Sequence, residues 1–403
     1  MILYNIGLRF LHSLFWIAHF VNAKANLFVK GRRQSFIKLD RFNKSRNTKN
    51  LLYWFHCASL GEFEQARPLM EAIKIQHPET LIAISFFSPS GYEIQKNYAT
   101  ADLVFYLPMA SKANAQKVLY LLQPQKIFFI KYEFWLNYIN VAHRLEIPVY
   151  LVSALFNPQQ LFFKWYGTMF LSVLRKYSKI FVQDKSSFDL LQKYQIKSII
   201  SGDTRFDRVL TNKTKVEKNE LIESFAGDKK IIVLGSSWQQ EERLIFSAYQ
   251  ANLNYKIIIA PHDIKRKIKV PSTLKSISYS QASIKNINGY EVLIIDNIGM
   301  LASLYGYAHL AFVGGGYRGS LHNILEAAVF GIPVVYGYQT QKHPEAEALQ
   351  KAGGGIIIDE QEQLSKILYD LLTNDSERDV VCKNSLNFII ENAGATQKIM
   401  AEI

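Results

Sequence analysis

Short apolar runs alternate with segments of helical period along most of the chain after residue 50. The runs cover residues 51–56, 81–87, 126–131, 147–153 and 179–183, and then 230–236, 256–261, 291–296, 308–316, 332–337 and 354–359. Between them, stretches such as 64–75 and 137–146 repeat their apolar residues at helical spacing. Strands that are apolar throughout and separated by helices are typical of parallel sheets covered on both faces. The pattern therefore predicts an α/β protein.

A polar and basic segment, residues 204–220, separates the two series of strands. A chain of 403 residues is also too long for one ordinary core. We predict two Rossmann-like domains that face each other across a cleft, with ligands bound at the carboxyl ends of the strands. The predicted boundaries are 1–30 for an N-terminal apolar helix, 31–210 for the first domain and 211–403 for the second.

The N-terminal segment is apolar but short. Its uncharged stretch, Phe10–Ala23, has 14 residues, whereas a helix that spans a bilayer needs about 20. Nine basic residues and a single acid follow between Lys24 and Lys49. This pattern favours a helix lying in a membrane interface, with its basic continuation held by anionic headgroups. A cleaved signal peptide and a simple buried first helix are the alternatives.

The net charge limits the kinds of partner that we expect, and the cysteine content limits the disulfides and metal sites. The net charge of +13 predicts a polyanionic partner, which could be nucleic acid, anionic lipid or a phosphorylated substrate. No nucleic-acid motif is visible and the basic residues gather beside the apolar helix, so we expect no nucleic acid. The two cysteines, Cys57 and Cys382, form no CxxC or Cys/His cluster, and no Asp-x-Asp pair occurs. The sequence therefore gives no support to a disulfide framework or a metal cofactor.

Polar signatures follow several of the predicted strands. Ser59 and Glu62 follow the first and have the S-x-x-E spacing of a helix capping box. Glu133 follows the run 126–131, and short polar or glycine-rich motifs follow several runs of the second series. Because the carboxyl ends of parallel strands share one edge of a sheet, their joint placement indicates a site. Capping alone remains an alternative for Glu62, and we interpret Glu64 as a surface residue.

The segment 311–337 is the richest in glycine. Its G-x-G-x-x-G pattern at 314–319 matches a dinucleotide fingerprint, but the next strand lacks the acid that would hold the ribose, which excludes NAD and FAD. We predict a glycine-rich turn feeding a helix that starts near His322, Asn323 and Glu326. Such a helix start attracts phosphate, and the carboxylate could hold ribose hydroxyls or a base edge. A solvated helix acid is the alternative for Glu326.

Six motifs together resemble those of the bacterial 3-deoxy-D-manno-octulosonic acid (Kdo) transferases of lipopolysaccharide synthesis. In the order of that family they are "HCASLGE", "SPSGYE", "YEFWLN", "SGDTRFD", "LYGYAHLAFVGGG" and "HNILEAAVFGIPVVYG". They extend across nearly the whole chain. The resemblance implies a GT-B fold and an inverting, metal-independent glycosyltransferase. It also implies CMP-Kdo as donor, a lipid A precursor (lipid IVA) as acceptor, and a place at the cytoplasmic face of the bacterial inner membrane.

The resemblance also assigns roles to residues. It implies Glu62 as general base, with Glu133 and Arg205 supporting the transition state. The implied CMP site consists of Pro261, His262, Ile298, Gly299, Met300, Asn323, Ile324, Leu325 and Glu326. Relatives often have Pro-Arg-His where this chain has Pro-His-Asp at 261–263, so His262 replaces a phosphate-facing arginine and Arg318 could supply the cation. A GT-B transferase or epimerase that uses a UDP-sugar is the alternative function, and a non-catalytic basic binding module is a more distant one.

Overall fold

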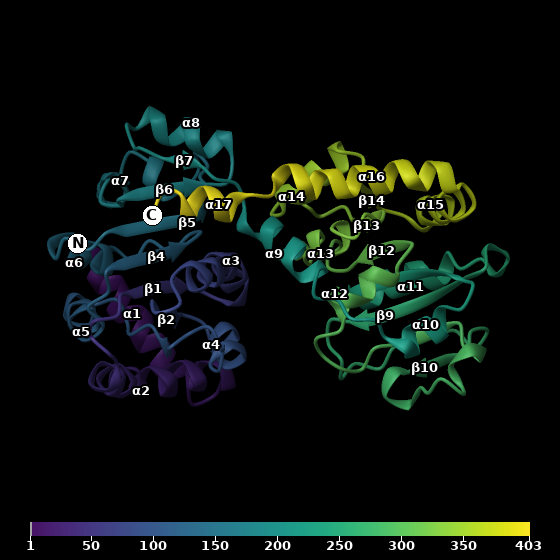
Figure 1. Ribbon diagram of the computed structural model, residues 1–403, viewed down its shortest axis with the longest axis horizontal. Helices are drawn as coiled ribbons and strands as arrows, with labels where there is room; N and C mark the ends of the chain where they lie inside the picture. Colours follow the sequence, from purple (N-terminus) through teal and green to yellow (C-terminus); the bar gives the residue numbers. More distant parts are fainter. Residues whose placement is uncertain (1) are drawn as a thin grey trace. The chain divides into compact units, whose positions relative to one another are not determined.

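The computed structural model describes residues 2–403, with the backbone alone for residues 2, 3, 9, 11, 12, 23 and 24. The chain divides into two units (Figure 1). The first runs to Arg208 and takes in Ala393–Ile403, and the second is Val209–Asn392. Each unit contains a parallel sheet of seven strands, which confirms the predicted α/β architecture with two Rossmann-like domains.

The first sheet has the strand order β3-β2-β1-β4-β5-β6-β7. Its strands are β1 (Leu52–Cys57), β2 (Leu81–Phe86), β3 (Leu103–Tyr106), β4 (Lys126–Ile130), β5 (Val149–Ala154), β6 (Lys179–Val182) and β7 (Ile199–Ile200). Successive residues of a strand point to opposite faces. Trp54 and Phe129 accordingly belong to one core cluster, whereas Phe55 and Phe128 belong to another. Both faces of this sheet are therefore buried, as the uninterrupted apolar runs predict.

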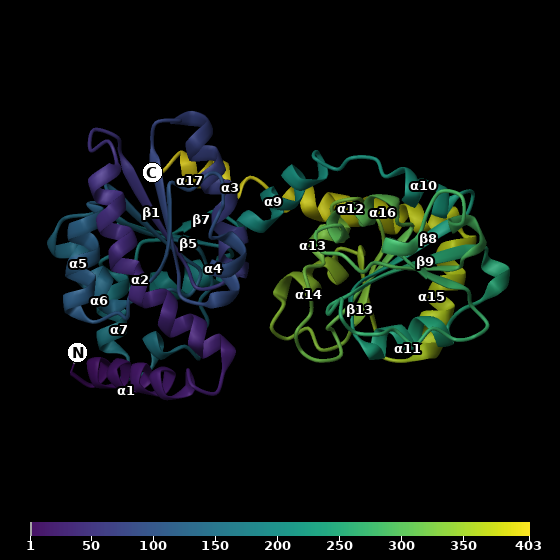
Figure 2. The same cartoon turned by 90° about the horizontal axis from the view of Figure 1, so that it is seen from below.

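The helices of the first unit cover these two faces (Figure 2). They are α1 (Ile2–Ala18), α2 (Ala23–Ser45), α3 (Leu60–Gln76), α4 (Pro89–Gln95), α5 (Lys112–Leu122), α6 (Leu136–Arg144), α7 (Thr168–Leu174), α8 (Lys185–Lys193) and α17 (Ala395–Met400). The predicted helical stretches 64–75 and 137–146 correspond to α3 and α6.

The second sheet has the order β10-β11-β9-β8-β12-β13-β14. Its strands are β8 (Lys230–Ser237), β9 (Tyr255–Pro261), β10 (Ser276–Ser278), β11 (Val292–Ile294), β12 (Leu310–Val313), β13 (Val334–Gly337) and β14 (Gly355–Ile358). Its helices are α10 (Glu220–Ala226), α11 (Gln239–Ser247), α12 (Leu301–Leu304), α13 (Leu325–Ala328), α14 (Pro344–Lys351), α15 (Gln361–Thr373) and α16 (Asp375–Asn392).

The N-terminal segment forms two helices rather than one. The Asn22 side chain accepts a hydrogen bond from the Ala25 N–H at 3.1 Å, so Asn22 caps the start of α2. The predicted boundary at residue 30 falls inside α2, which packs on β3 through a 2.7 Å bond from the Ser35 hydroxyl to the Tyr106 carbonyl. No helix within residues 2–403 combines the length and the apolar character needed to cross a membrane.

The predicted connection 204–220 begins with a helix, α9 (Thr204–Lys213), and the change of unit falls inside it. Our boundary at residue 210 placed the whole C-terminus in the second domain, but the end of the chain returns to the first unit. Asp207 accepts hydrogen bonds from the N–H groups of Gly394 and Thr396, both at 2.6 Å, and so holds the start of α17. Ile399 is buried in the core of the first unit.

Candidate functional site

Glu62 lies in the first turn of α3, directly after β1. Its Oε2 atom accepts hydrogen bonds from the Ser59 N–H at 3.0 Å and from the Ser59 hydroxyl. The predicted capping contact of Glu62 is therefore present. The side chain is partly exposed, and both bonds that fix it use the same oxygen atom.

Glu133 lies just beyond β4, the neighbour of β1 in the sheet. Its Oε2 atom is 2.9 Å from Nε2 of His56 and accepts a hydrogen bond from the Trp135 indole N–H. The Tyr177 hydroxyl donates to the Glu133 backbone carbonyl at 3.1 Å. The carboxylate is 12% exposed, so it is held in a defined orientation at the edge of the core.

Arg205 lies at the start of α9 and is tied to an acid within its own motif. Its Nε and Nη2 atoms each lie 2.8 Å from Oδ2 of Asp203. The buried Asp203 also accepts a bond from Nε2 of Gln65 at 3.1 Å. Gln65 is one helical turn beyond Glu62. The contact of Asp203 with Gln65 therefore brings the Arg205 guanidinium close to the beginning of α3.

The acids of this region surround the end of β1. Burial raises the pKa of the Cys57 thiol well above its usual value, and the charges of Glu62, Glu133 and Glu64 raise it further. Glu64 does more than lie on the surface, because it accepts a 3.0 Å bond from Nε of the buried Arg208. Sequence reasoning missed this role because the partner is 144 residues away.

In the second unit, Pro261 ends β9 and His262 follows it. The His262 N–H donates to the Ser237 carbonyl at 3.0 Å, at the end of the neighbouring strand β8. The His262 ring stacks on Trp238 with centroids 4.5 Å apart, and the Arg318 guanidinium lies 4.2 Å from the centre of the Trp238 ring. The sequence prediction gave Trp238 no role. In the structure Trp238 contacts both His262, where the resemblance predicts arginine, and Arg318, the cation that could replace it.

His322 continues this stack, with its ring centroid 4.7 Å from that of His262. Its Nε2 atom is buried without a hydrogen-bond partner among residues 2–403. Burial lowers the pKa of His322 to about 4, with smaller contributions from His262 and His343. This imidazole is therefore neutral at pH 7, and its buried nitrogen can act as a hydrogen-bond donor or acceptor for a ligand.

The predicted helix after the glycine-rich turn begins later than expected. Turns and irregular chain extend to Ile324, and α13 covers only Leu325–Ala328. Ile324 and Leu325 are buried, whereas Glu326 is partly exposed and its Oε1 accepts a bond from the Asn323 side chain at 3.0 Å. The Asn–Glu pair is therefore formed, on a short helical turn.

Close packing of backbones explains the glycines of this turn. A Cβ on Gly316 would lie 2.5 Å from the backbone nitrogen of Gly337, and one on Gly314 would lie 2.2 Å from the carbonyl oxygen of Ser236. Gly315 has φ +89°, a conformation that favours glycine. Its N–H donates to the buried Glu241 at 2.8 Å, a contact that the sequence prediction did not include.

The third part of the predicted CMP site, Ile298, Gly299 and Met300, precedes α12. Ile298 is 86% exposed and Gly299 has φ +100°. Met300 receives a contact from the Asn297 amide at 3.0 Å from its sulfur. This loop therefore presents an apolar side chain to solvent on the same unit as His262 and Glu326.

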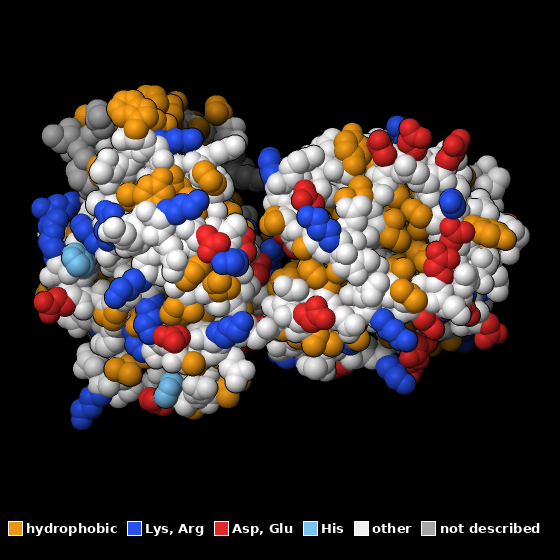
Figure 3. All heavy atoms as spheres, turned by 90° about the horizontal axis from the view of Figure 1, so that it is seen from above, with side chains coloured by type: hydrophobic (Ala, Val, Ile, Leu, Met, Phe, Trp, Pro, Cys, Tyr) orange, Lys and Arg blue, Asp and Glu red, His pale blue; other side chains and the backbone are white. Residues whose placement is uncertain are grey.

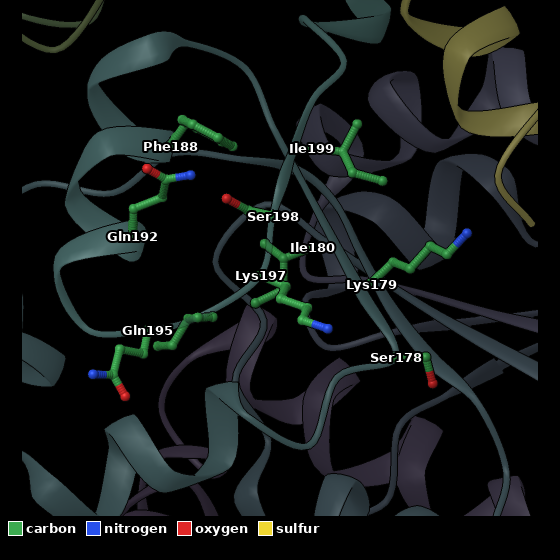
Figure 4. Close-up of a pocket in the computed structure, with 10 residues that line it drawn as sticks. Ser178, Lys179, Ile180, Phe188, Gln192, Gln195, Lys197, Ser198 and Ile199 are labelled. Carbon is green, nitrogen blue, oxygen red and sulfur yellow. The ribbon is translucent and has the colours of Figure 1, made fainter.

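A cavity of about 690 Å³ lies elsewhere, beside β6, β7 and α8 (Figure 4). Its lining includes Lys179, Phe188, Gln192 and Ser198, and none of the predicted site residues. Among the side chains that the structure describes, no three of His, Cys, Asp or Glu come together as a metal site requires.

Residues 31–208 match the family model described as 3-deoxy-D-manno-octulosonic-acid transferase (kdotransferase). A bifunctional glycosyltransferase/methyltransferase of Fusobacterium nucleatum is 25% identical over 369 residues, which are 87% of this chain and 57% of that protein. The 3-deoxy-D-manno-octulosonic acid transferase of Aquifex aeolicus is 26% identical over 353 residues, which are 85% of this chain and 92% of that protein.

A solved structure supports the fold. The UDP-GlcNAc 2-epimerase of Neisseria meningitidis, bound to UDP-GlcNAc, superimposes with a TM-score of 0.61 at 15% identity. The match covers 87% of this chain and 98% of that one. At this level of identity the likeness concerns the fold, a pair of Rossmann-like domains of the GT-B type.

Proposed function

This chain belongs to the family of Kdo transferases, and from that premise we propose that it moves Kdo from CMP-Kdo to a lipid A precursor, lipid IVA, in lipopolysaccharide core synthesis. The reaction is an inverting displacement that needs no metal. The observation that carries the proposal is the pair of carboxylates, Glu62 and Glu133, beyond the ends of the adjacent strands β1 and β4. They lie in the unit that matches the family model.

Glu62 has the properties of a general base. In the proposed step a hydroxyl of the acceptor attacks the anomeric carbon of Kdo, the bond from that carbon to the phosphate oxygen breaks, and CMP leaves. The acceptor proton passes to Glu62. Because both capping bonds use Oε2, Oε1 is the atom that would take the proton.

Glu133 and Arg205 provide charges of opposite sign near this base. Displacement of CMP develops positive charge on the sugar ring and negative charge on the leaving phosphate. A fixed carboxylate stabilises the first of these charges and a fixed guanidinium the second, since preorganised groups cost little reorganisation during the reaction. Glu133 is fixed by His56 and Trp135, and Arg205 by Asp203.

The donor nucleotide is proposed to bind the second unit. The carboxyl ends of β8, β9 and β12 bring together an Arg318–Trp238–His262–His322 stack. Arg318 supplies a permanent cation for phosphate, although the motif at 261–263 lacks the arginine found in relatives. The Asn323–Glu326 pair offers a carboxylate for ribose hydroxyls.

We further propose that α1 binds the cytoplasmic face of the inner membrane. Tyr4 and Leu8 pack on the core, while the opposite side of the helix and the turn after it expose large apolar side chains. These are Ile6, Phe10, Leu14, Trp16, Ile17, Phe20 and Val21. Hydrophobic side chains gather at the corresponding border of the first unit, at the upper left in Figure 3. Such a stripe beside the basic α2 fits an anionic interface.

The proposal is tested with the purified chain, CMP-Kdo and a tetraacyl lipid A precursor, with mass spectrometry of the glycolipid. We expect a mass increase of one or more Kdo residues, unchanged by a chelator. Transfer that stops in the chelator would refute metal independence. Parallel reactions with UDP-sugars address the alternative substrate class, and an unmodified glycolipid with CMP-Kdo would refute the proposed function.

A further inference from the structure

A fully buried histidine contacts the Glu133 carboxylate. His56 lies in β1 directly opposite Ser85 of β2. Its Nε2 atom is 2.9 Å from Oε2 of Glu133, and its Nδ1 atom is 2.8 Å from the Ser85 hydroxyl. The Trp54 indole N–H donates to the same hydroxyl at 2.8 Å. A continuous chain of hydrogen bonds therefore runs from the core to the carboxylate.

The partners of the two ring nitrogens indicate where the His56 protons lie. Nδ1 is 2.8 Å from the Ser85 hydroxyl and 3.1 Å from the Ser85 backbone carbonyl, so it faces one group that can donate to it and one that can only accept from it. Nε2 faces the Glu133 carboxylate, which only accepts, so we assign a proton to Nε2. The Trp135 indole N–H is 3.0 Å from Nε2 of His56 and also contacts Oε2 of Glu133, which is the acceptor that remains when Nε2 carries the proton. The His56 and Trp135 protons are then both directed toward one carboxylate oxygen.

We propose that His56 is a positioning residue for Glu133. Through its Nε2–H group it holds the carboxylate in place and stabilises its negative charge during Kdo transfer. This inference rests on the proposed function, because it assigns Glu133 a part in that reaction.

The cost of burying these groups supports the assignment. Ser85 and His56 are completely buried in a strand region that is otherwise apolar. Burying polar groups is unfavourable unless each is hydrogen-bonded, and an apolar pair would serve packing alone. A network that is fully satisfied and ends on a partly exposed carboxylate is typical of a group held for chemistry.

Two substitutions separate the two ring nitrogens. His56→Asn places its amide near Nδ1, so it keeps a partner at Ser85 and loses Glu133. His56→Gln reaches the position of Nε2 and can still donate to Glu133. We expect the Asn variant to lower kcat by about 10–100-fold, the usual effect of losing an outer partner of a reactive group. KM for CMP-Kdo should stay unchanged, and the Gln variant should lose much less.

The experiment measures steady-state Kdo transfer by the full chain carrying each variant, alone and combined with Glu133→Gln. If His56 acts through Glu133, His56→Asn adds nothing to Glu133→Gln. His309→Asn is the matched control, since this half-buried histidine accepts a 3.1 Å bond from the Ile231 N–H in the other unit. It should lower the melting temperature without a selective loss of kcat. Equal losses of kcat in His56→Asn and His56→Gln would overturn the inference. Full additivity of the kcat losses of His56→Asn and Glu133→Gln would also overturn it.

A second measurement does not depend on activity. Imidazole ¹⁵N spectra show which ring nitrogen carries the proton, and the His56 signals are those absent from His56→Asn. We expect a protonated Nε2 in the parent chain and changed His56 signals in Glu133→Gln. An Nε2 without a proton, or signals unaffected by Glu133→Gln, would overturn the inference even in a chain that transfers Kdo. Absence of transfer with the expected spectra would instead count against the proposed function.

Discussion

The substitution Glu62→Gln separates the capping contact that this side chain makes from the general-base role that we propose for it. The amide oxygen can still accept a hydrogen bond from the Ser59 N–H, which the carboxylate accepts at 3.0 Å. It cannot take a proton from an acceptor hydroxyl. Exchanging a charged acceptor for a neutral one costs about 1 kcal/mol, and losing the charge at the helix start costs about 0.3–1 kcal/mol. Stability should therefore fall by no more than about 2 kcal/mol.

The effect on turnover should be larger. A positioned general base contributes about 10²–10⁴-fold, which corresponds to about 2.7–5.5 kcal/mol of activation free energy. Because the donor nucleotide is proposed to bind the second unit, CMP affinity should not change. The loss should therefore appear in a single turnover of Kdo transfer at saturating CMP-Kdo.

The control is Ser59→Ala, which removes the hydroxyl that bonds to Glu62 and leaves the carboxylate in place. It should lower stability by about 0.5–2 kcal/mol, the usual cost of losing a cap, and leave turnover within a few-fold. Melting temperatures and single-turnover rates of both variants distinguish a general base from a residue that only caps the helix. A Glu62→Gln enzyme with near-normal turnover would refute the assignment of Glu62 as base and leave capping as its role.

Three further predictions concern other parts of the chain. Glu326→Ala should weaken CMP binding by about 1.5–3 kcal/mol if the carboxylate bonds to ribose; unchanged affinity by calorimetry in a folded variant would leave Glu326 as a solvated acid. Replacing Phe10, Ile17 and Phe20 by serine should reduce binding to anionic vesicles while the fold persists, since these side chains are exposed. If this variant still binds the vesicles fully in high salt, the interfacial role of α1 is contradicted. The lowered pKa of His322 means that the unfolded chain binds its proton more readily, so stability should fall as the pH drops from about 6.5 to about 4. His322→Gln should show a weaker dependence of melting temperature on pH in that range, and an identical dependence would contradict this account.

The apolar runs predicted the interior strands because both faces of those strands are buried. The three strands that were missed, β3, β7 and β10, all lie at an edge of a sheet. They are short, and β7 has only two residues. The fourth edge strand, β14, was predicted from the run 354–359, so a place at the edge of a sheet is not sufficient for a strand to be missed. The pattern of a single chain is therefore weakest for short strands at the edges of a sheet.

The polar connection 204–220 shows a related limit. Its charged residues predicted a linker, but Phe206 and Val209 are buried and α9 begins inside the "SGDTRFD" motif. The same motif supplies Asp203 to Arg205 and Asp207 to the start of α17. Asp203 contacts Arg205 because the turn of the chain places them together, and Asp207 contacts Thr396, which is distant in sequence. The local composition predicts neither contact.

The catalytic candidates could be named from sequence, but the groups that hold them could not. His56 lies in an apolar strand and is easily taken for a core residue, although it contacts Glu133 across 77 residues. Glu241 accepts a 3.1 Å bond from the Trp238 N–H at the start of α11, where no serine or threonine marks a helix cap in the sequence. Tertiary contacts, and not spacing along the chain, define these supporting residues.

The donor side shows why a departure from a motif is difficult to interpret without a structure. His262 stands where the resemblance to Kdo transferases predicts arginine, so the sequence alone indicates the loss of a phosphate-binding cation. In the fold, Arg318 lies on one face of Trp238 and His262 is stacked on the same indole. The guanidinium thus comes from a turn 56 residues further along the chain and lies over Trp238, the residue after β8, because the glycines at 314–316 let that turn pack against the backbone of β8 and β13. The folded unit therefore brings a positive charge to the indole on which His262 is stacked, although position 262 itself carries no arginine.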